Sequence, residues 1–296
     1  MTGHTPIPHS GVNHLFNRPT SVYAFSTMNP KRNAAACTAL ACLAAVCPLL
    51  SLTAAPPPGY QLAWADEFDG TALDTNKWHH RGLGERRGAR NVTNAVAVAG
   101  GFLSITTYTA EGKHHTGMIG TEGKFERSFG YYEARIRFED SPGMWSAFWS
   151  QTPTMGSHIG DPAQAGMELD ILEHRVTDKD GKNIGGKVQH TLHWDGYGPE
   201  HKSRTHLTED LGLNSRFHVY GFEWTPTEYR CFIDGKLTWT TGPVSKRPQY
   251  LILSCEVQDN GWAGKIPSAG YGDLASSRTR MVVDYVRYYA PVRQSR

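Results

Sequence analysis

The chain has 296 residues, of which 39% are hydrophobic and 11% are aromatic. This is enough for one domain with a substantial core, and it leaves room for a segment outside the fold. The formal net charge at pH 7 is +2 and no basic run stands out, which argues against a dedicated nucleic-acid partner.

The N-terminal residues 1–55 are predicted to lie outside the folded domain. A basic start at Met28–Arg32 precedes an Ala/Leu/Cys run over residues 34–52, and small residues follow at 53–55. This order is typical of a secretory signal peptide. We therefore expect an N-terminal extension plus a signal, with translation starting at Met28, and a secreted or periplasmic protein. The apolar run approaches the ~20 residues of a membrane span, so an uncleaved membrane anchor is the alternative.

Residues 56–59 predict a short stiff linker, because prolines precede a glycine there. The segment from residue 60 to 290 predicts the folded domain, and residues 291–296 predict a short tail. This domain shows no sustained helical period, whereas short alternating runs and Gly-rich turns recur along it. The pattern is typical of an all-β sandwich or barrel.

The clearest strand signals lie in separate parts of this domain. Residues 95–107 predict a hairpin with a Gly-Gly turn, and residues 229–240 predict another hairpin across Asp234-Gly235. Residues 131–139 alternate apolar and charged side chains, which predicts a strand with one face turned to the core. These signals give the domain at least one amphipathic sheet.

The stretch Gly166–His174 holds acids at Glu168, Asp170 and Glu173, separated by apolar residues. We predict a strand, in which side chains at i and i+2 share a face, so Glu168 and Asp170 point the same way. Strict alternation would turn Glu173 to the opposite face. One extra residue in a β-bulge between Asp170 and Glu173 would return all of these acids to one surface.

A row of carboxylates on a rigid surface suits the cleavage of a glycosidic bond. One carboxylate acts as nucleophile and another as general acid and then base, about 5–5.5 Å apart in retaining enzymes. An acid between them would share a hydrogen bond, and mutual repulsion would raise at least one pKa. The alternatives are a solvated acidic strand face and a cation site.

This stretch resembles the E-x-D-x-x-E active-site strand of glycoside hydrolase family 16, which includes laminarinases, lichenases, agarases and carrageenases. Other stretches resemble further landmarks of the family in the same order along the chain. They are Trp64–Gly70 with Leu73, Asp74 and Trp78, then Gly130–Ile136, Gly143–Trp149, Phe217–Trp224 and Val283–Arg287. The resemblance implies a concanavalin A-like jelly roll, a β-sandwich of two curved antiparallel sheets with the sugar across the concave one.

By this resemblance Glu168 is the expected nucleophile, Glu173 the acid/base and Asp170 the helper between them, with retention of configuration. We expect a monomeric, secreted endo-hydrolase of a polysaccharide that needs no cofactor for catalysis. Neither a nucleic-acid partner nor stable membrane association after signal removal is expected. A transglycosylase and a non-catalytic glycan-binding jelly roll are the alternatives.

The substrate is best predicted as a β-1,3-glucan of the laminarin type. Residues 145–149 and 192–194 look most like the members of the family that cleave this glucan. Residues 251–258 depart from the laminarinase pattern, however. A galactan of the agar, porphyran or carrageenan type is therefore the alternative.

Aromatic residues near the acids are candidates for substrate contact. Trp145 and Trp149 are spaced by four in a strand, so both indoles could face one cleft and pack on sugar rings, although core packing is the alternative. His193 and Trp194 look like the His-aromatic pair that the family places beside its acids. A satisfied or surface histidine is the alternative there.

Related enzymes bind a structural calcium on the convex side, and Glu67, Gly101 and Asp284 fall where those enzymes place its ligands. Oxygen ligands from separate loops suit Ca²⁺, so the resemblance implies a possible calcium site there. Outside the leader the cysteines are Cys231 and Cys255. They could form a disulfide in an exported protein, but both lie in apolar runs, and we expect free buried thiols.

Overall fold

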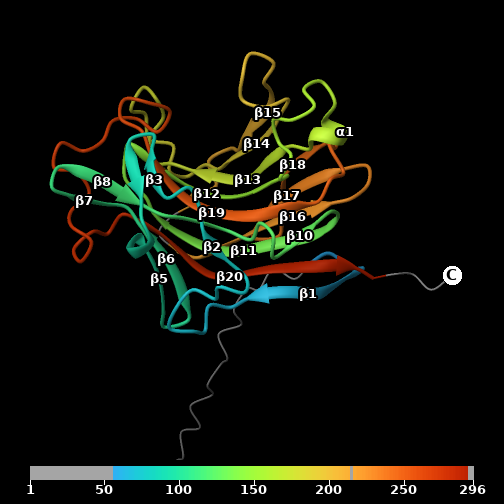
Figure 1. The fold of residues 1–296 in the computed structure, drawn as a ribbon, viewed down its shortest axis with the longest axis horizontal. Coiled ribbons are helices and arrows are strands. Elements are labelled where there is room, and N and C mark those ends of the chain that lie inside the picture. The colour runs from blue at the N-terminus through green and yellow to red at the C-terminus, as the bar shows by residue number, and fades with distance from the viewer. Residues whose placement is uncertain (1–55, 214–215, 293–296) are drawn as a thin grey trace, which may run out of the picture. The chain divides into compact units, whose positions relative to one another are not determined.

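The computed structural model describes residues 56–213 and 216–292. In this part the chain is almost entirely β-structure, with short helical turns at η1 (Thr93–Ala95) and α1 (Pro162–Ala165) (Figure 1). The predicted leader over residues 1–55 lies outside the described residues. No helix in the described ranges is both long and apolar enough to cross a membrane.

The first sheet is built from segments at both ends and the middle of the domain. Its strands are β1 (Tyr60–Asp66), β5 (Val96–Ala99), β6 (Phe102–Thr106), β11 (Gly130–Glu139), β16 (His218–Trp224), β17 (Tyr229–Ile233), β18 (Lys236–Thr241) and β20 (Arg280–Pro291). Their order is β18-β17-β16-β11-β20-β6-β5, and β1 pairs with the long β20. The pairs of this sheet are antiparallel.

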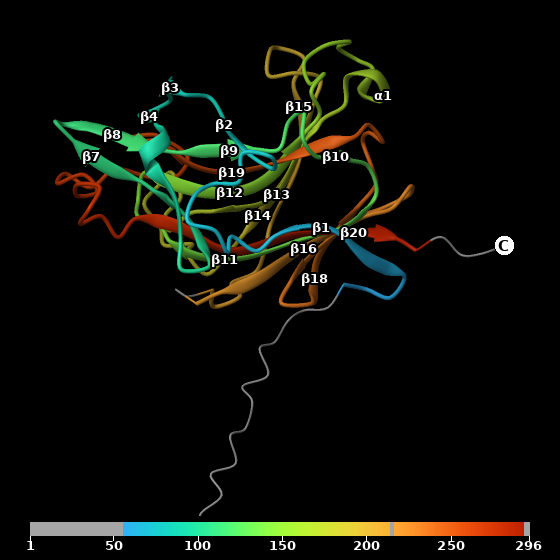
Figure 2. The same cartoon turned by 60° about the horizontal axis from the view of Figure 1, so that its bottom comes forward.

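The second sheet carries the acidic stretch at its centre. Its strands are β2 (His79–His80), β9 (Met118–Gly120), β10 (Glu126–Arg127), β12 (Met144–Gln151), β13 (Glu168–His174), β14 (Gln189–Trp194), β15 (Lys202–Leu207) and β19 (Gln249–Val257). Their order is β15-β14-β13-β12-β19-β9-β2, and β10 pairs with β19. Figure 2 shows β12, β13 and β19 stacked above β11, β16 and β20.

A smaller sheet lies beside these two in the order β3-β4-β8-β7. It contains β3 (Gly84–Arg86), β4 (Ala89–Asn91), β7 (Tyr108–Ala110) and β8 (Lys113–Thr116). The β4–β8 pair is parallel, whereas the other pairs of this sheet are antiparallel. The backbone N–H of Gly88 donates to the carbonyl oxygen of Val257 at 2.8 Å, so this segment lies against the end of β19 in the second sheet.

The core fills the space between the two large sheets. Every second side chain of β11, from Tyr132 to Phe138, is buried in it, as the alternation of residues 131–139 predicts. Leu169 and Leu172 of β13 enter the same core from the opposite sheet. The predicted all-β sandwich of two antiparallel sheets is therefore confirmed.

The predicted hairpins and thiols are also confirmed. β5 and β6 pair across Gly100-Gly101, and β17 and β18 pair across Asp234-Gly235. Asp234 and Gly235 have φ angles of 49° and 77°, the left-handed pair that a tight hairpin turn of the I′ type requires. Cys231 and Cys255 are buried and not bonded to each other.

Candidate active site

The register of β13 shows how the acids reach one face. Against β14, the pairing shifts between Asp170 and Glu173. Against β12, Phe148 pairs with Leu172 while the next residue, Trp149, pairs with Asp170, so Ile171 is the extra residue of a bulge. The predicted β-bulge is present, and it restores Glu173 to the face that carries Asp170.

A buried histidine holds the bulge in place. Nδ1 of His190 donates a hydrogen bond of 2.6 Å to the carbonyl oxygen of Ile171, and Nε2 lies 3.0 Å from Oγ1 of Thr238. Burial lowers the pKa of His190 to about 4, with His206 acting in the same direction and the bond to Ile171 opposing it. The ring is therefore neutral near pH 7 and keeps the bulge carbonyl satisfied.

A cavity of about 570 Å³ opens over this face of the second sheet. Strands β12, β13, β14 and β19 form its floor, and the segment around residues 81–87 forms one side. The predicted site residues that line it are Glu168, Asp170, Glu173, Trp145, Trp149 and His193. The structure thus brings together most of the residues predicted for catalysis and substrate contact.

Trp194 is the exception, and its predicted place in the cleft is wrong. It packs against the core between the sheets, and the guanidinium of Arg204 lies 5.9 Å from its ring. The physical reason is strand alternation: neighbours on β14 face opposite ways, so His193 points into the cavity and Trp194 away from it.

The two tryptophans of β12 line the cavity but are almost completely buried. Trp145 is 6% exposed and Trp149 is 7% exposed. Nε1 of Trp149 donates to Oγ of Ser254 at 3.1 Å, and the ring of Trp145 meets Trp262 edge to face at 5.3 Å. Both rings are therefore fixed by packing and at the same time form part of the cavity wall.

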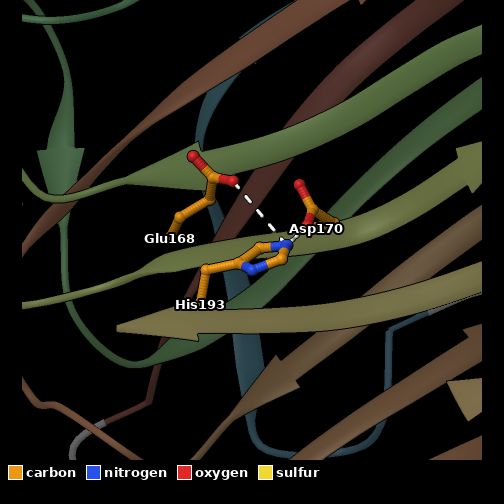
Figure 3. Close-up of side chains that lie close together, drawn as sticks. All are labelled: Glu168, Asp170 and His193. Atoms are coloured by element: carbon orange, nitrogen blue, oxygen red, sulfur yellow. Dashed lines mark ion pairs between the residues drawn. The ribbon is translucent and has the colours of Figure 1, made fainter. Parts of the chain in front are cut away.

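His193 stands between two of the acids (Figure 3). Its Nε2 lies 3.3 Å from Oδ2 of Asp170 and 4.0 Å from Oε1 of Glu168. Its Nδ1 lies 2.8 Å from Nε2 of His201, on the loop that follows β14. The ring therefore links Asp170 to the loop, with one nitrogen facing each partner.

The surroundings of the acids set their ionisation. Burial is the largest cause that raises the pKa of Glu168, Asp170 and Glu173 alike. Asp170 and Glu168 raise the pKa of Glu173 further, whereas Glu168 accepts hydrogen bonds that oppose the rise. Glu168 is thus suited to be the ionised carboxylate, and Glu173 to keep its proton until it donates it.

Several polar residues of the cavity are not predicted from the sequence. Gln151 and Tyr197 donate hydrogen bonds to Oε2 of Glu168. Glu256 of β19 accepts from Arg86 at 2.8 Å and from Arg87 at 2.6 Å. Alternation from Trp149 could have placed Gln151 on the cleft face, and the departure at residues 251–258 marks Glu256, but no sequence signal marks a loop residue such as Tyr197.

The acids and His193 also have a spacing that could suit a cation. Among the described residues, Glu168, Asp170 and His193 form a group whose ligand atoms all lie within 4.8 Å of one another. Oε2 of Glu168 already accepts from Gln151 and Tyr197.

The acids predicted to bind a structural calcium are paired with arginines instead. Both carboxylate oxygens of Glu67 accept from Arg287 at 2.8 Å. Asp284 pairs with Arg135, and Gly101 lies in the β5–β6 turn. The guanidinium groups already balance the two carboxylates, so this donor set does not fit a calcium ion as arranged. The calcium site stays an untested prediction.

Comparison with known proteins places these features in a family. The family model described as "Beta-porphyranase A-D, GH16 domain" matches residues 61–291. The chain is 28% identical over 272 residues to glucan endo-1,3-beta-glucosidase A1 of Niallia circulans, which covers 78% of this chain and 38% of that protein. It is also 28% identical over 265 residues to keratan-sulfate endo-1,4-beta-galactosidase of Sphingobacterium multivorum, covering 81% of this chain and 58% of that protein.

The fold agrees with a solved structure. The laminarinase from Rhodothermus marinus superimposes with a TM-score of 0.62 at 28% identity, covering 79% of this chain and 98% of that chain. The fold is therefore the jelly roll expected from the sequence. The chain spans less than two thirds of the length of the glucosidase and the galactosidase named above.

Proposed function

The chain belongs to glycoside hydrolase family 16, and from this premise we propose that it is a retaining endo-glycosidase with Glu168 as nucleophile and Glu173 as acid/base. The observation that carries the proposal is the bulge at Ile171, which turns both glutamates into one cavity. Two carboxylates on one face with opposite ionisation preferences are what double displacement requires.

In the first step, Glu168 attacks the anomeric carbon, and the bond from that carbon to the leaving oxygen breaks. The leaving oxygen takes the proton of Glu173. In the second step, Glu173 accepts a proton from water, whose oxygen displaces Glu168 and restores the original configuration. Asp170 and His193 lie beside Glu168 and can adjust the hydrogen bonding as the charges change.

We favour a charged galactan of the porphyran type as the substrate. The matching family model is described as a porphyranase domain. Arg81, Arg86 and Arg87 line the cavity together with the catalytic acids. Guanidinium groups recognise anionic oxygens through paired hydrogen bonds, which suits a sulfated sugar. An exported enzyme fits a polymer of this size, in keeping with the signal predicted within residues 28–55.

A neutral β-1,3-glucan is the second candidate. It is favoured by the similarity to a glucan endo-1,3-beta-glucosidase and to a laminarinase. Both candidates use the same catalytic residues, so they differ only in which sugar the cavity accepts.

The test is a panel of porphyran, agarose, laminarin, lichenan and carrageenan, with release of reducing ends measured for the full chain. We expect hydrolysis of porphyran, and loss of at least about 10³-fold in turnover for Glu168→Gln, because the amide cannot form the glycosyl ester. Glu209→Gln, an exposed residue paired with Lys236 outside the cavity, is the matched control. Full activity of Glu168→Gln would contradict the mechanism, and exclusive hydrolysis of laminarin would select the second candidate.

A further inference from the structure

We propose that Gln151 and Tyr197 are positioning residues that hold Glu168 by its Oε2 atom and leave Oε1 to attack the anomeric carbon, an inference that rests on the proposed function. Nε2 of Gln151 donates to Oε2 at 2.9 Å, and the hydroxyl of Tyr197 donates to the same atom. A carboxylate oxygen has two lone pairs, so Oε2 is saturated. Within the described part of the chain no hydrogen bond reaches Oε1, which lies 4.0 Å from Nε2 of His193.

The orientation of the Gln151 amide is fixed by its other partners. Its Oε1 accepts from Nη2 of Arg81 at 2.9 Å and from the hydroxyl of Tyr250 at 2.6 Å. Arginine can only donate, so the amide oxygen must face Arg81 and the NH₂ group must face Glu168. Arg81 is itself paired with Glu122 at 2.6 Å. With this orientation, Nε2 of Gln151 donates both to Glu168 and to the hydroxyl oxygen of Tyr197, which lies 2.6 Å away.

Tyr197 is brought to the nucleophile by an anchored loop between β14 and β15, which rises at the top of Figure 1. Oδ1 of Asp195 accepts from the backbone N–H of Gly160 at 2.9 Å, and its Oδ2 pairs with Lys202 at 2.7 Å. Asp195 is only 1% exposed. Gly196 has a φ of +72°, and a Cβ there would lie 3.2 Å from the side chain of Ile159. The loop is thus tied at both ends of the turn that presents Tyr197.

The two donors have a defined effect on the reaction. When Oε1 of Glu168 bonds to the anomeric carbon, Oε2 becomes the carbonyl oxygen of an ester, which accepts hydrogen bonds less strongly than a carboxylate. When water displaces the ester, the electron pair of the broken bond returns to Glu168. Gln151 and Tyr197 therefore stabilise the carboxylate in the free enzyme and as it departs.

Other charged groups also face Glu168, and the test has to leave them unchanged. Glu256 raises the pKa of Glu168, and His193 lowers it. Asp170 and Glu173 share the cavity with Glu168. Among the described residues, the titratable and charged groups that line the cavity with Glu168 are Asp170 and Glu173 on β13, His193 on β14, Tyr197 and His201 on the following loop, Glu256 on β19, and Arg81, Arg86 and Arg87. Tyr250 of β19 reaches the same network through Gln151. Tyr197→Phe removes one hydrogen bond to Glu168 without changing the net charge near pH 7. Gln151→Leu also keeps the net charge, but besides its bond to Glu168 it removes the acceptor of Arg81 and Tyr250, so Tyr197→Phe is the more specific variant.

The experiment measures kcat/KM against pH for the full chain, on whichever of porphyran, agarose or laminarin the wild type hydrolyses. Each variant is expected to shift the acidic limb to higher pH by about one unit, because a hydrogen bond to a charged group has roughly that effect on a pKa. Tyr288→Phe is the matched control, because that hydroxyl donates to the carbonyl of Phe129 at 3.0 Å and not to the cavity. Its acidic limb should coincide with that of the wild type.

The outcomes separate this inference from the proposed function. Unshifted acidic limbs in both variants, while Glu168→Gln is inactive, would overturn the positioning role and leave the mechanism standing. An active Glu168→Gln, or a wild type that hydrolyses none of these polymers, would overturn both. If Gln151→Leu does not fold, Tyr197→Phe on its loop still decides the question by its pH profile.

Discussion

Glu168 and Glu173 carry the same functional group, and the residues around each of them set its role. Glu168 accepts hydrogen bonds from Gln151 and Tyr197, which stabilise its ionised form against the effect of burial. Glu173 lies behind Asp170, and its pKa is raised well above the ordinary range by burial first and then by the other acids. The proposed nucleophile and the proposed acid are thus distinguished by hydrogen bonds that the sequence motif alone does not contain.

Another buried carboxyl group, that of Glu133 on β11, gives a prediction of how stability depends on pH. Its Oε1 accepts from the hydroxyl of Tyr285 at 2.9 Å, whereas Oε2 has no hydrogen-bond partner within the described ranges. Burial raises the pKa of Glu133 to about 7; Glu67 adds to the rise, while Tyr285 and Arg287 oppose it. In the unfolded chain an ordinary glutamate titrates near about pH 4.3.

The direction in which stability changes with pH follows from the pKa of Glu133 in the folded and in the unfolded chain. Below about pH 4.3 both states hold the proton, and its stabilising contribution is complete. Between that pH and about 7 the unfolded chain loses the proton first, so the free energy of unfolding falls as pH rises. As pH rises from 4.5 to 8, we expect the free energy of unfolding of Glu133→Gln to fall by ~2 kcal/mol less than that of the wild type, after allowing for solvent screening. Urea unfolding at pH 4.5, 6 and 8 checks it, with Glu209→Gln as control, and parallel curves for wild type and Glu133→Gln would contradict it.

At the scale of one element, β13 depends on its neighbour β14. His190 of β14 satisfies the carbonyl of Ile171, the extra residue of the bulge. We expect His190→Leu to lower the free energy of unfolding by ~1–3 kcal/mol, because a buried carbonyl loses its partner. We also expect kcat to fall by about tenfold or more, because the bulge aims Glu173 relative to Glu168.

Urea unfolding and steady-state kinetics at one pH measure both effects of His190→Leu. His206→Leu is the control, because its ring stacks 6.3 Å from His190 and lies outside the bulge. An unchanged kcat in a folded but destabilised His190→Leu would show that the bulge does not depend on this hydrogen bond for its catalytic geometry.

Elements with a strong local pattern could be predicted, and those made by tertiary pairing could not. The alternation in β11 and the turn at Asp234-Gly235 are visible in the sequence. The spacing of the acids predicts the bulge, because only an extra residue places Glu173 on the face of Asp170. Strands as short as β2 or β10 have too few residues for a periodic signal, since partners far along the chain define them. The family pattern predicts Trp194 in the cleft, whereas strand alternation on β14 turns it towards the core, as found. The alternation in β11 also does not show that Glu133, on the face turned away from the core, is fully buried.

At the scale of the molecule, both acids of the predicted calcium site are paired with arginines. Arg287 holds Glu67 and Arg135 holds Asp284. We therefore expect the melting temperature to be the same in excess calcium and in excess chelator. Differential scanning calorimetry of the full chain under both conditions tests this, with magnesium as the control ion. A rise of several degrees specific to calcium would show that the ion displaces the guanidinium groups and would restore the predicted site.

In the proposed mechanism, the bulge of β13 lets Glu168 and Glu173 act on opposite sides of one linkage by double displacement. The most direct measurement is ¹H NMR of the reducing end released by the wild type in the first minutes, on the β-linked polymer identified by the panel. We predict that the β-anomer forms first and then mutarotates, because two inversions restore the configuration. Initial release of the α-anomer would mean a single displacement by water, and it would contradict Glu168 as the nucleophile.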